Sequence, residues 1–133
     1  GMRIGFAMGN KKLIQAMKDV KESINSYTMT AASILIGAAA LEDEDYFQEK
    51  LAMVMATRSR VKEELERRGF TVLDSRANFL FAKKEGVSGT ELFEKLRDKK
   101  IFVRHFNGER IKDYLRITIG TPEQMQRFFE ELD

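Results

Sequence analysis

The stretch DYLRITIGTPEQMQRFFEEL (residues 113–132) decides the fold class, because a strand pattern in it is followed at once by a helix start. Residues 114–119 alternate between apolar and polar side chains, which is typical of a strand with one buried face. Thr121 then serves as an N-cap and Pro122 as the first helical residue. The helix that follows has an apolar stripe of Met125, Phe128, Phe129 and Leu132. A strand joined to an amphipathic helix predicts an α+β unit.

The residues before this stretch extend the same pattern. Strand-like runs occur at residues 70–73, 78–82 and 101–104, and Ser88 begins a helix with an apolar face of Leu92, Phe93 and Leu96. We therefore expect residues 70–133 to form a small, mostly antiparallel sheet covered on one side by helices. The phenylalanines at 79, 81, 128 and 129 are predicted to lie in its core.

The N-terminal part has a different character. A short buried strand is expected at residues 3–9, then a helix capped by Asn10, a loop at residues 23–30 and an Ala-rich helix at residues 30–41. A long helix opens at Asp43 and ends at Gly69. We expect residues 43–133 to be a small domain with a long connecting helix, and residues 1–42 to belong to another, larger domain.

Composition excludes several classes of function. The 133 residues contain 23 basic and 21 acidic side chains, a balance that gives no general attraction to nucleic acid or membrane. The chain has no cysteine, so disulfides and thiolate metal sites are excluded, and no metal-binding motif occurs. The longest apolar run, residues 34–41, is too short to span a bilayer. The lack of cysteine is compatible with the cytosol.

Three arginines stand in unusual local settings. Arg3 lies between apolar residues, Arg104 ends the apolar run 101–104, and Arg116 lies within an alternating strand. A charged residue in such a place is exposed, paired with a carboxylate, or part of an anion site. Arginine suits phosphate and carboxylate because its planar guanidinium donates two parallel hydrogen bonds. The residues alone leave both interpretations open, an anion site or an ordinary exposed or salt-bridged arginine.

Four segments, in order, resemble the fold-type I aminotransferases that depend on pyridoxal phosphate, in the histidinol-phosphate branch. Residues 1–10 (GMRIGFAMGN) resemble the family's G-x-R-x-G-(Y/F)-x-x-(G/A) stretch. VRHF (residues 103–106) with DYLRITIGT (residues 113–121) resembles its C-terminal motif. AALED (residues 39–43) and ANFLF (residues 77–81) also match, so the similarity covers essentially the whole chain.

The resemblance implies a fold, a reaction and three site residues. The fold is the C-terminal small domain, preceded by a remnant of the large cofactor-binding domain. Arg3 matches the arginine that binds the phosphate of pyridoxal phosphate, Arg116 the one that binds the substrate's anionic group or α-carboxylate, and Arg104 one that helps hold a substrate phosphate. The implied enzyme is a cytoplasmic homodimer of histidine biosynthesis that moves an amino group between glutamate and imidazole acetol phosphate. His105 is expected to be structural.

One family feature falls outside this sequence. The cofactor-binding lysine belongs shortly before the position of Arg3, so we assign no catalytic residue here. We expect the chain alone neither to bind pyridoxal phosphate nor to catalyse transfer. Two alternatives remain: a fragment of an enzyme like threonine-phosphate decarboxylase, which shares the same arginines, and a non-catalytic domain that self-associates or binds a partner.

Overall fold

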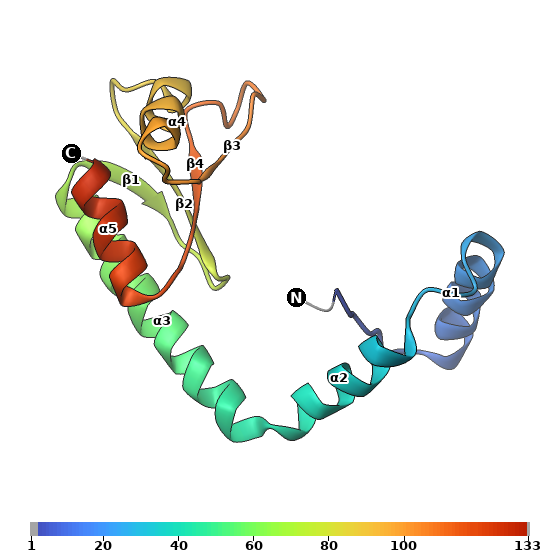
Figure 1. The fold of residues 1–133 in the computed structure, drawn as a ribbon. Helices are drawn as coiled ribbons and strands as arrows, with labels where there is room; N and C mark the ends of the chain where they lie inside the picture. Colours follow the sequence, from blue (N-terminus) through green and yellow to red (C-terminus); the bar gives the residue numbers. More distant parts are fainter. Residues whose placement is uncertain (1–2, 133) are drawn as a thin grey trace. The chain divides into compact units, whose positions relative to one another are not determined.

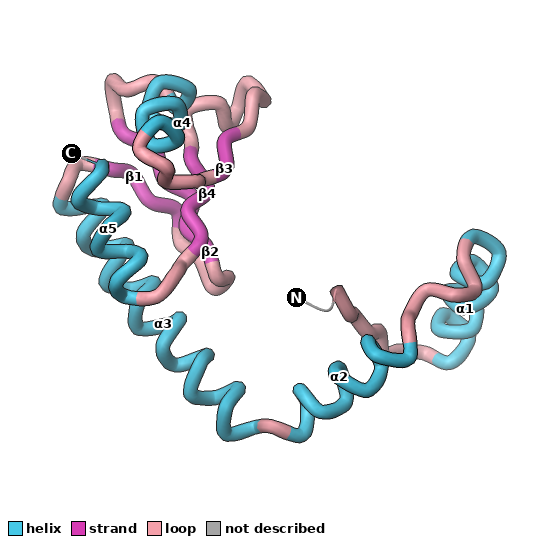
Figure 2. The backbone as a smooth tube through the Cα atoms, viewed as in Figure 1, coloured by secondary structure: helices cyan, strands magenta, loops and turns pink. Residues whose placement is uncertain are grey.

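The fold is seen in a computed structural model that describes residues 3–132 and contains two compact units, residues 1–48 and residues 49–133. Figures 1 and 2 show the helices and strands along the chain. Among the described residues, no helix is both long and apolar enough to cross a membrane.

The first unit contains two helices, α1 (Lys11–Ile24) and α2 (Ala31–Glu42), both of which the sequence predicts. The side chain of Asn10 caps α1 by accepting from the backbone N–H of Lys12, and Thr30 caps α2 in the same way through Ser33. Capping satisfies backbone donors that have no partner within the helix.

The predicted buried strand at residues 3–9 is wrong. These residues have no regular structure and are exposed, because no strand in the described part of the chain pairs with their backbone. Ile4 instead lies against Gly37 of α2, where the Cβ atom of any larger residue would come within 2.6 Å of the Ile4 Cδ1 atom. The small residues of α2 therefore allow this close approach, as their composition predicts.

The helix α3 (Glu44–Arg67) begins next to α2 in the sequence and ends beside Gly69, whose φ of 81° is in the left-handed region. Thr57, Val61 and Leu65 are its buried residues, all in its C-terminal half. Near the end of α3, hydrogen bonds from Arg67 and then Arg68 lower the pKa of Glu64 to about 2.

The second unit is built on a four-stranded sheet with the order β1-β2-β4-β3, in which every neighbouring pair is antiparallel. Its strands are β1 (Phe70–Leu73), β2 (Phe79–Lys84), β3 (Arg104–His105) and β4 (Leu115–Thr118). Two more helices complete the unit, α4 (Gly89–Asp98) and α5 (Pro122–Leu132). The α+β class and the antiparallel sheet are confirmed.

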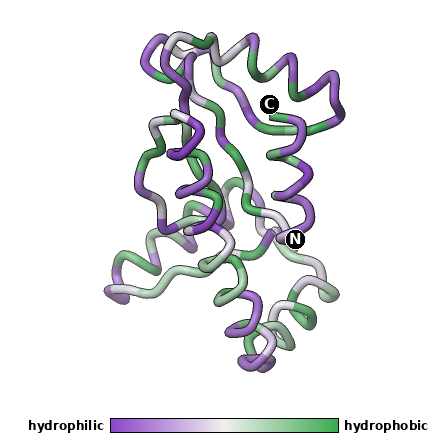
Figure 3. The backbone as a smooth tube through the Cα atoms, turned by 90° about the vertical axis from the view of Figure 1, so that its left-hand side faces the viewer, coloured by the Kyte–Doolittle hydropathy of each residue, from purple (hydrophilic) through white to green (hydrophobic). Residues whose placement is uncertain are grey.

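All three helices of this unit cover the same face of the sheet. The core consists of sheet residues from β1, β2 and β4 packed against buried residues of α3, α4 and α5: Phe70, Leu80, Ala82, Leu115, Ile117, Val61, Leu65, Leu92, Leu96, Met125, Phe128 and Leu132. The alternating hydrophobic and hydrophilic bands along the helices show this amphipathic pattern (Figure 3). Within the described part of this unit, the opposite face of the sheet has no helix over it.

The strand predicted at residues 101–104 is wrong in its bounds, since β3 contains only Arg104 and His105. Lys100 has a φ of 64°, so the chain makes a left-handed turn directly after α4. Ile101 and Val103 then pack on the core without pairing to a strand, and Phe102 is 78% exposed. An apolar run can thus cover a core without joining a sheet.

Candidate anion-binding site

The face of the sheet without helices carries two of the three arginines. In the strand register, Leu73 pairs with Phe81, Phe81 with Arg116, and Arg116 with Arg104, so these residues form one row across the four strands. Paired residues in antiparallel strands direct their side chains to the same face. Arg104 and Arg116 are therefore direct neighbours, although 12 positions separate them in the sequence.

Arg116 is half-buried and has an unsatisfied donor. Its Nε atom is buried and has no hydrogen-bond partner among the described residues, while its guanidinium carbon lies 5.3 Å from the ring centroid of Phe79. Buried donors are almost always paired in folded proteins, because an unpaired one costs about 1–3 kcal/mol. Arg116 thus carries a charged group that residues 3–132 do not fully satisfy.

Arg104 is exposed, and its guanidinium lies over the aromatic ring of Phe106. Its guanidinium carbon is 5.4 Å from the ring centroid of Phe106. Among residues 3–132, no carboxylate forms an ion pair with either arginine. Two like charges in adjacent strands repel each other unless an anion lies between them. The pair thus has the charge and the unused donors that a phosphate or carboxylate needs.

The aromatic side chains of this face support the two arginines. Phe81 stacks on Tyr114 at 4.7 Å between ring centroids and meets Phe106 edge-on at 6.4 Å. Phe79 and Phe81 are thus not in the core, which corrects the prediction for these two, whereas Phe128 is buried as expected. The sequence carried a signal for this. Lys83 lies two residues after Phe81 and four after Phe79 on β2, so the three side chains lie on the same face, and a lysine indicates that this face is open to solvent.

Arg3 lies in the first unit. It is exposed and has a φ of 57°, and no described residue forms an ion pair with it. It borders a hollow whose lining is otherwise apolar, with side chains such as Ile4, Phe6, Met29 and Leu41. A cation beside an apolar surface interacts more strongly with an anion than one surrounded by water does.

His105 lies on the helix side of the sheet, since it pairs with the buried Leu115. Its ring stacks on Phe93 of α4 with 5.7 Å between centroids, and its Nε2 atom lies 2.6 Å from the carbonyl oxygen of Lys112. These contacts connect α4, β3 and the following loop. The expected structural role therefore agrees with its place in the fold.

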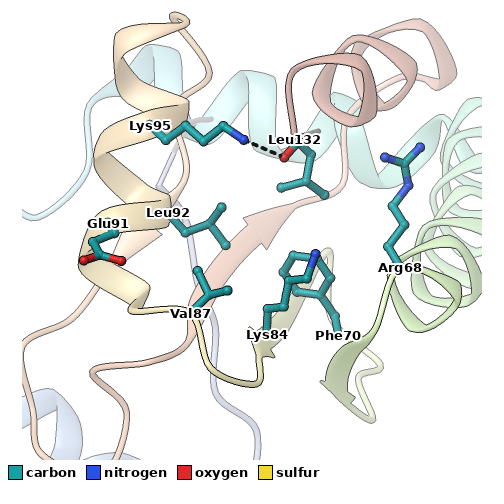
Figure 4. Close-up of a pocket in the computed structure, with 8 residues that line it drawn as sticks. All are labelled: Arg68, Phe70, Lys84, Val87, Glu91, Leu92, Lys95 and Leu132. Carbon is teal, nitrogen blue, oxygen red and sulfur yellow. Dashed lines mark hydrogen bonds between the residues drawn. The ribbon is translucent and has the colours of Figure 1, made fainter.

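A pocket at the end of α5 is lined by several basic side chains, which stabilise the end of that helix (Figure 4). Its lining includes Lys95, which donates to the carbonyl oxygen of Leu132 at 3.3 Å, and Arg68, which donates to that of Phe129 at 3.2 Å. Lys99 nearby donates to the carbonyl oxygen of Glu131 at 3.1 Å. The last carbonyls of a helix lack partners within the helix, so these cations stabilise the C-terminus of α5.

Comparison with known proteins identifies the family of the chain. The model of the aminotransferase class I and II family matches residues 1–132. The chain is 44% identical over 132 residues to the histidinol-phosphate aminotransferase of Brachyspira hyodysenteriae, covering 99% of this chain and 37% of that protein. It is 45% identical over 133 residues to histidinol-phosphate aminotransferase 2 of Rhizobium meliloti, covering 100% and 38%. The chain thus spans little more than a third of the length of these relatives.

Solved structures give the same result. The histidinol-phosphate aminotransferase of Clostridium acetobutylicum superposes with a TM-score of 0.63 at 30% identity, over 69% of this chain and 29% of that one. The enzyme of Sinorhizobium meliloti, solved in complex with pyridoxal-5'-phosphate, has a TM-score of 0.71 over 89% of this chain and 31% of that one. At 23% identity, the second likeness shows the fold alone. With the family model matching nearly every residue, the chain belongs to the class I and II aminotransferases.

Proposed function

We propose that this chain is the C-terminal part of a histidinol-phosphate aminotransferase and that it supplies the site for the substrate's phosphate. The observation that carries the proposal is the cross-strand pair of Arg104 and Arg116, with the buried Nε atom of Arg116 unpaired. Two cations favour a doubly charged phosphate over a single carboxylate. The whole enzyme would transfer an amino group between glutamate and imidazole acetol phosphate.

These two arginines bind and orient the substrate and do not move protons. Holding the phosphate end of a substrate at one place sets the position of its amino-bearing carbon, which is how such contacts contribute to rate. The rigid support of β3 and β4 suits that role, because sites on strands are positioned more accurately than sites on loops.

For the cofactor, we propose Arg3 as a phosphate ligand of pyridoxal phosphate. The residue fits, since it is a cation without a described partner beside an apolar hollow. When bound, this cofactor accepts the electrons that remain on the substrate carbon after it loses a proton. We also propose that residues 1–42 belong to the large domain and residues 43–133 to the small domain of the enzyme.

A second proposal, self-association, rests on the exposed apolar side chains of the first unit. The helix α1 has no buried residue, and Leu13 and Ile24 on it are 68% and 81% exposed. Apolar surface of this kind favours burial against another protein surface. Sedimentation of the chain and of Leu13→Glu tests this: we expect a dimer that the substitution weakens, and a monomeric parent chain would refute it.

The phosphate site can be tested by binding alone. We expect the chain to bind histidinol phosphate but not histidinol, and Arg104→Gln or Arg116→Gln to weaken binding about 10-fold or more, since hydrogen bonds to charged groups contribute about 1.5–3 kcal/mol. Arg127→Gln is the matched control, because Arg127 is exposed on α5. Equal binding of both ligands would refute the proposal. Tighter binding of O-phosphothreonine would favour the decarboxylase-like alternative.

A further inference from the structure

Phe79 is the aromatic residue that contacts Arg116 on the face of the sheet without helices. Its ring centroid lies 5.3 Å from the guanidinium carbon, within the range of a cation–π contact. In the register, Phe79 pairs with Thr118, two residues along β4 from Arg116, so the two side chains meet diagonally. The ring therefore limits the directions in which the guanidinium can point.

The loop before Phe79 is held by hydrogen bonds of its own. The Ser75 hydroxyl donates to the carbonyl oxygen of Phe79 at 2.7 Å and accepts from the N–H of Ala77 at 3.1 Å. Just beyond β4, Ile119 donates from its backbone N–H to the carbonyl oxygen of Asn78 at 2.9 Å. These bonds fix the backbone at Phe79 and directly before it.

Two side chains of helix α3 also bind the loop that precedes Phe79. Arg58 donates from Nη1 to the carbonyl oxygen of Ala77 at 2.8 Å, and Lys62 forms a short ion pair with Asp74. The ion pair lowers the pKa of Asp74 and raises that of Lys62. A loop that is bound at several points to a packed helix leaves the residue that follows it, Phe79, little freedom to move.

From this arrangement, we infer that Phe79 is a positioning residue for the anion-binding guanidinium of Arg116. The ring limits the directions in which the guanidinium can present its charge to a bound phosphate. The cation–π contact also stabilises the charge of a side chain that is partly removed from water. The inference rests on the proposed function of Arg116, and it assigns to Phe79 a role beyond packing.

The test compares Phe79→Leu with Phe79→Tyr in the full chain, using inorganic phosphate as the probe. Leucine keeps an apolar side chain but removes the ring, whereas tyrosine keeps the ring. We expect Phe79→Leu to weaken phosphate binding about 5-fold, in line with the strength of a cation–π contact, and Phe79→Tyr to bind like the parent. The Nε–Hε NMR signal of Arg116 should shift in Phe79→Leu only, because the ring current is lost.

Two results from the Phe79 variants would overturn the inference. The first is a shifted Arg116 signal without a change in phosphate affinity in Phe79→Leu, and the second is equal weakening in both variants. If Arg116→Gln loses binding while Phe79→Leu does not, only the positioning role fails. If Arg116→Gln binds phosphate like the parent, the proposed function fails and the inference fails with it. Backbone NMR spectra that match the parent's outside β2 and β4 show that the variants are folded.

Discussion

Without phosphate, the second unit of Arg104→Gln should be more stable than that of the parent. With phosphate, it should be less stable than that of the parent. Arg104 and Arg116 are direct cross-strand partners, and no described carboxylate pairs with either. Like charges at such positions destabilise a sheet by about 0.2–1 kcal/mol. The free energy of unfolding of Arg104→Gln should therefore exceed that of the parent by about 0.5 kcal/mol at low salt.

Phosphate should reverse this order. A ligand that binds only the folded state at 100 times its dissociation constant stabilises a protein by about 2.7 kcal/mol. The parent gains this stabilisation, whereas the variant has lost one of the two cations that hold the ligand. Sodium chloride at high concentration should reduce the advantage of the variant without phosphate, because salt screens the repulsion between exposed charges.

Urea unfolding, followed through the NMR signals of the buried Leu115 methyl groups, measures this difference in the second unit. The four conditions are low and high sodium chloride, each with and without phosphate. Arg127→Gln is the control, because it removes one positive charge from an exposed site on α5. Because glutamine also removes the contact of Arg104 with the Phe106 ring, the salt dependence is the decisive comparison. If high sodium chloride left the stability difference between Arg104→Gln and the parent unchanged, the two arginines would not repel each other as the register implies. The proposed anion site would then lack its electrostatic basis.

Three further predictions concern the rest of the second unit. Gly89→Ala should destabilise it by about 1–3 kcal/mol, because the new methyl group would come within 2.8 Å of the Asp113 Cα atom; thermal unfolding beside the exposed Thr90→Ala control checks this. Leu65→Ala should cost about 2–5 kcal/mol by leaving a cavity, since Leu65 is 0% exposed, and an unchanged midpoint in urea would contradict the packing. In the folded protein the pKa of Glu64 is about 2, below its ordinary value of 4.5. The stabilisation that Glu64 contributes should therefore be full above pH 4.5 and lost as the pH falls toward 2. In acid unfolding, Glu64→Gln, which cannot titrate, should lose less stability over that range.

Sequence patterns predicted the helices well because each helix carries its own signals. Asn10 and Thr121 cap two of them, and Gly69 ends the longest, all at positions that the pattern alone identifies. Capping and helical spacing depend on residues close together in the chain. Such signals remain visible when nothing is known of the tertiary structure.

Strands were predicted less well because a strand depends on a partner that the local sequence does not name. Residues 3–9 have strand-like composition but no strand to pair with in the described chain. The register that brings Arg104 beside Arg116 was equally hidden, since it depends on which side of β4 receives the short strand β3. Residue types and family resemblance thus identified the candidate residues of the proposed site, but not their geometry.

The two faces of the sheet differ in their packing and in their charge. The helix-covered face contains nearly every fully buried side chain, and there the end of α5 is held by Lys95 of α4 and by Arg68 and Lys99, which directly follow α3 and α4. The opposite face carries two adjacent cations, Arg104 and Arg116, and a donor without a partner among the described residues. A packed core would not tolerate such groups. Adjacent like charges do not favour folding, which is why we propose anion binding for this face. Substitutions on the helix side should therefore change the free energy of unfolding, and those at Arg104 and Arg116 should change affinity for phosphate while leaving the fold intact.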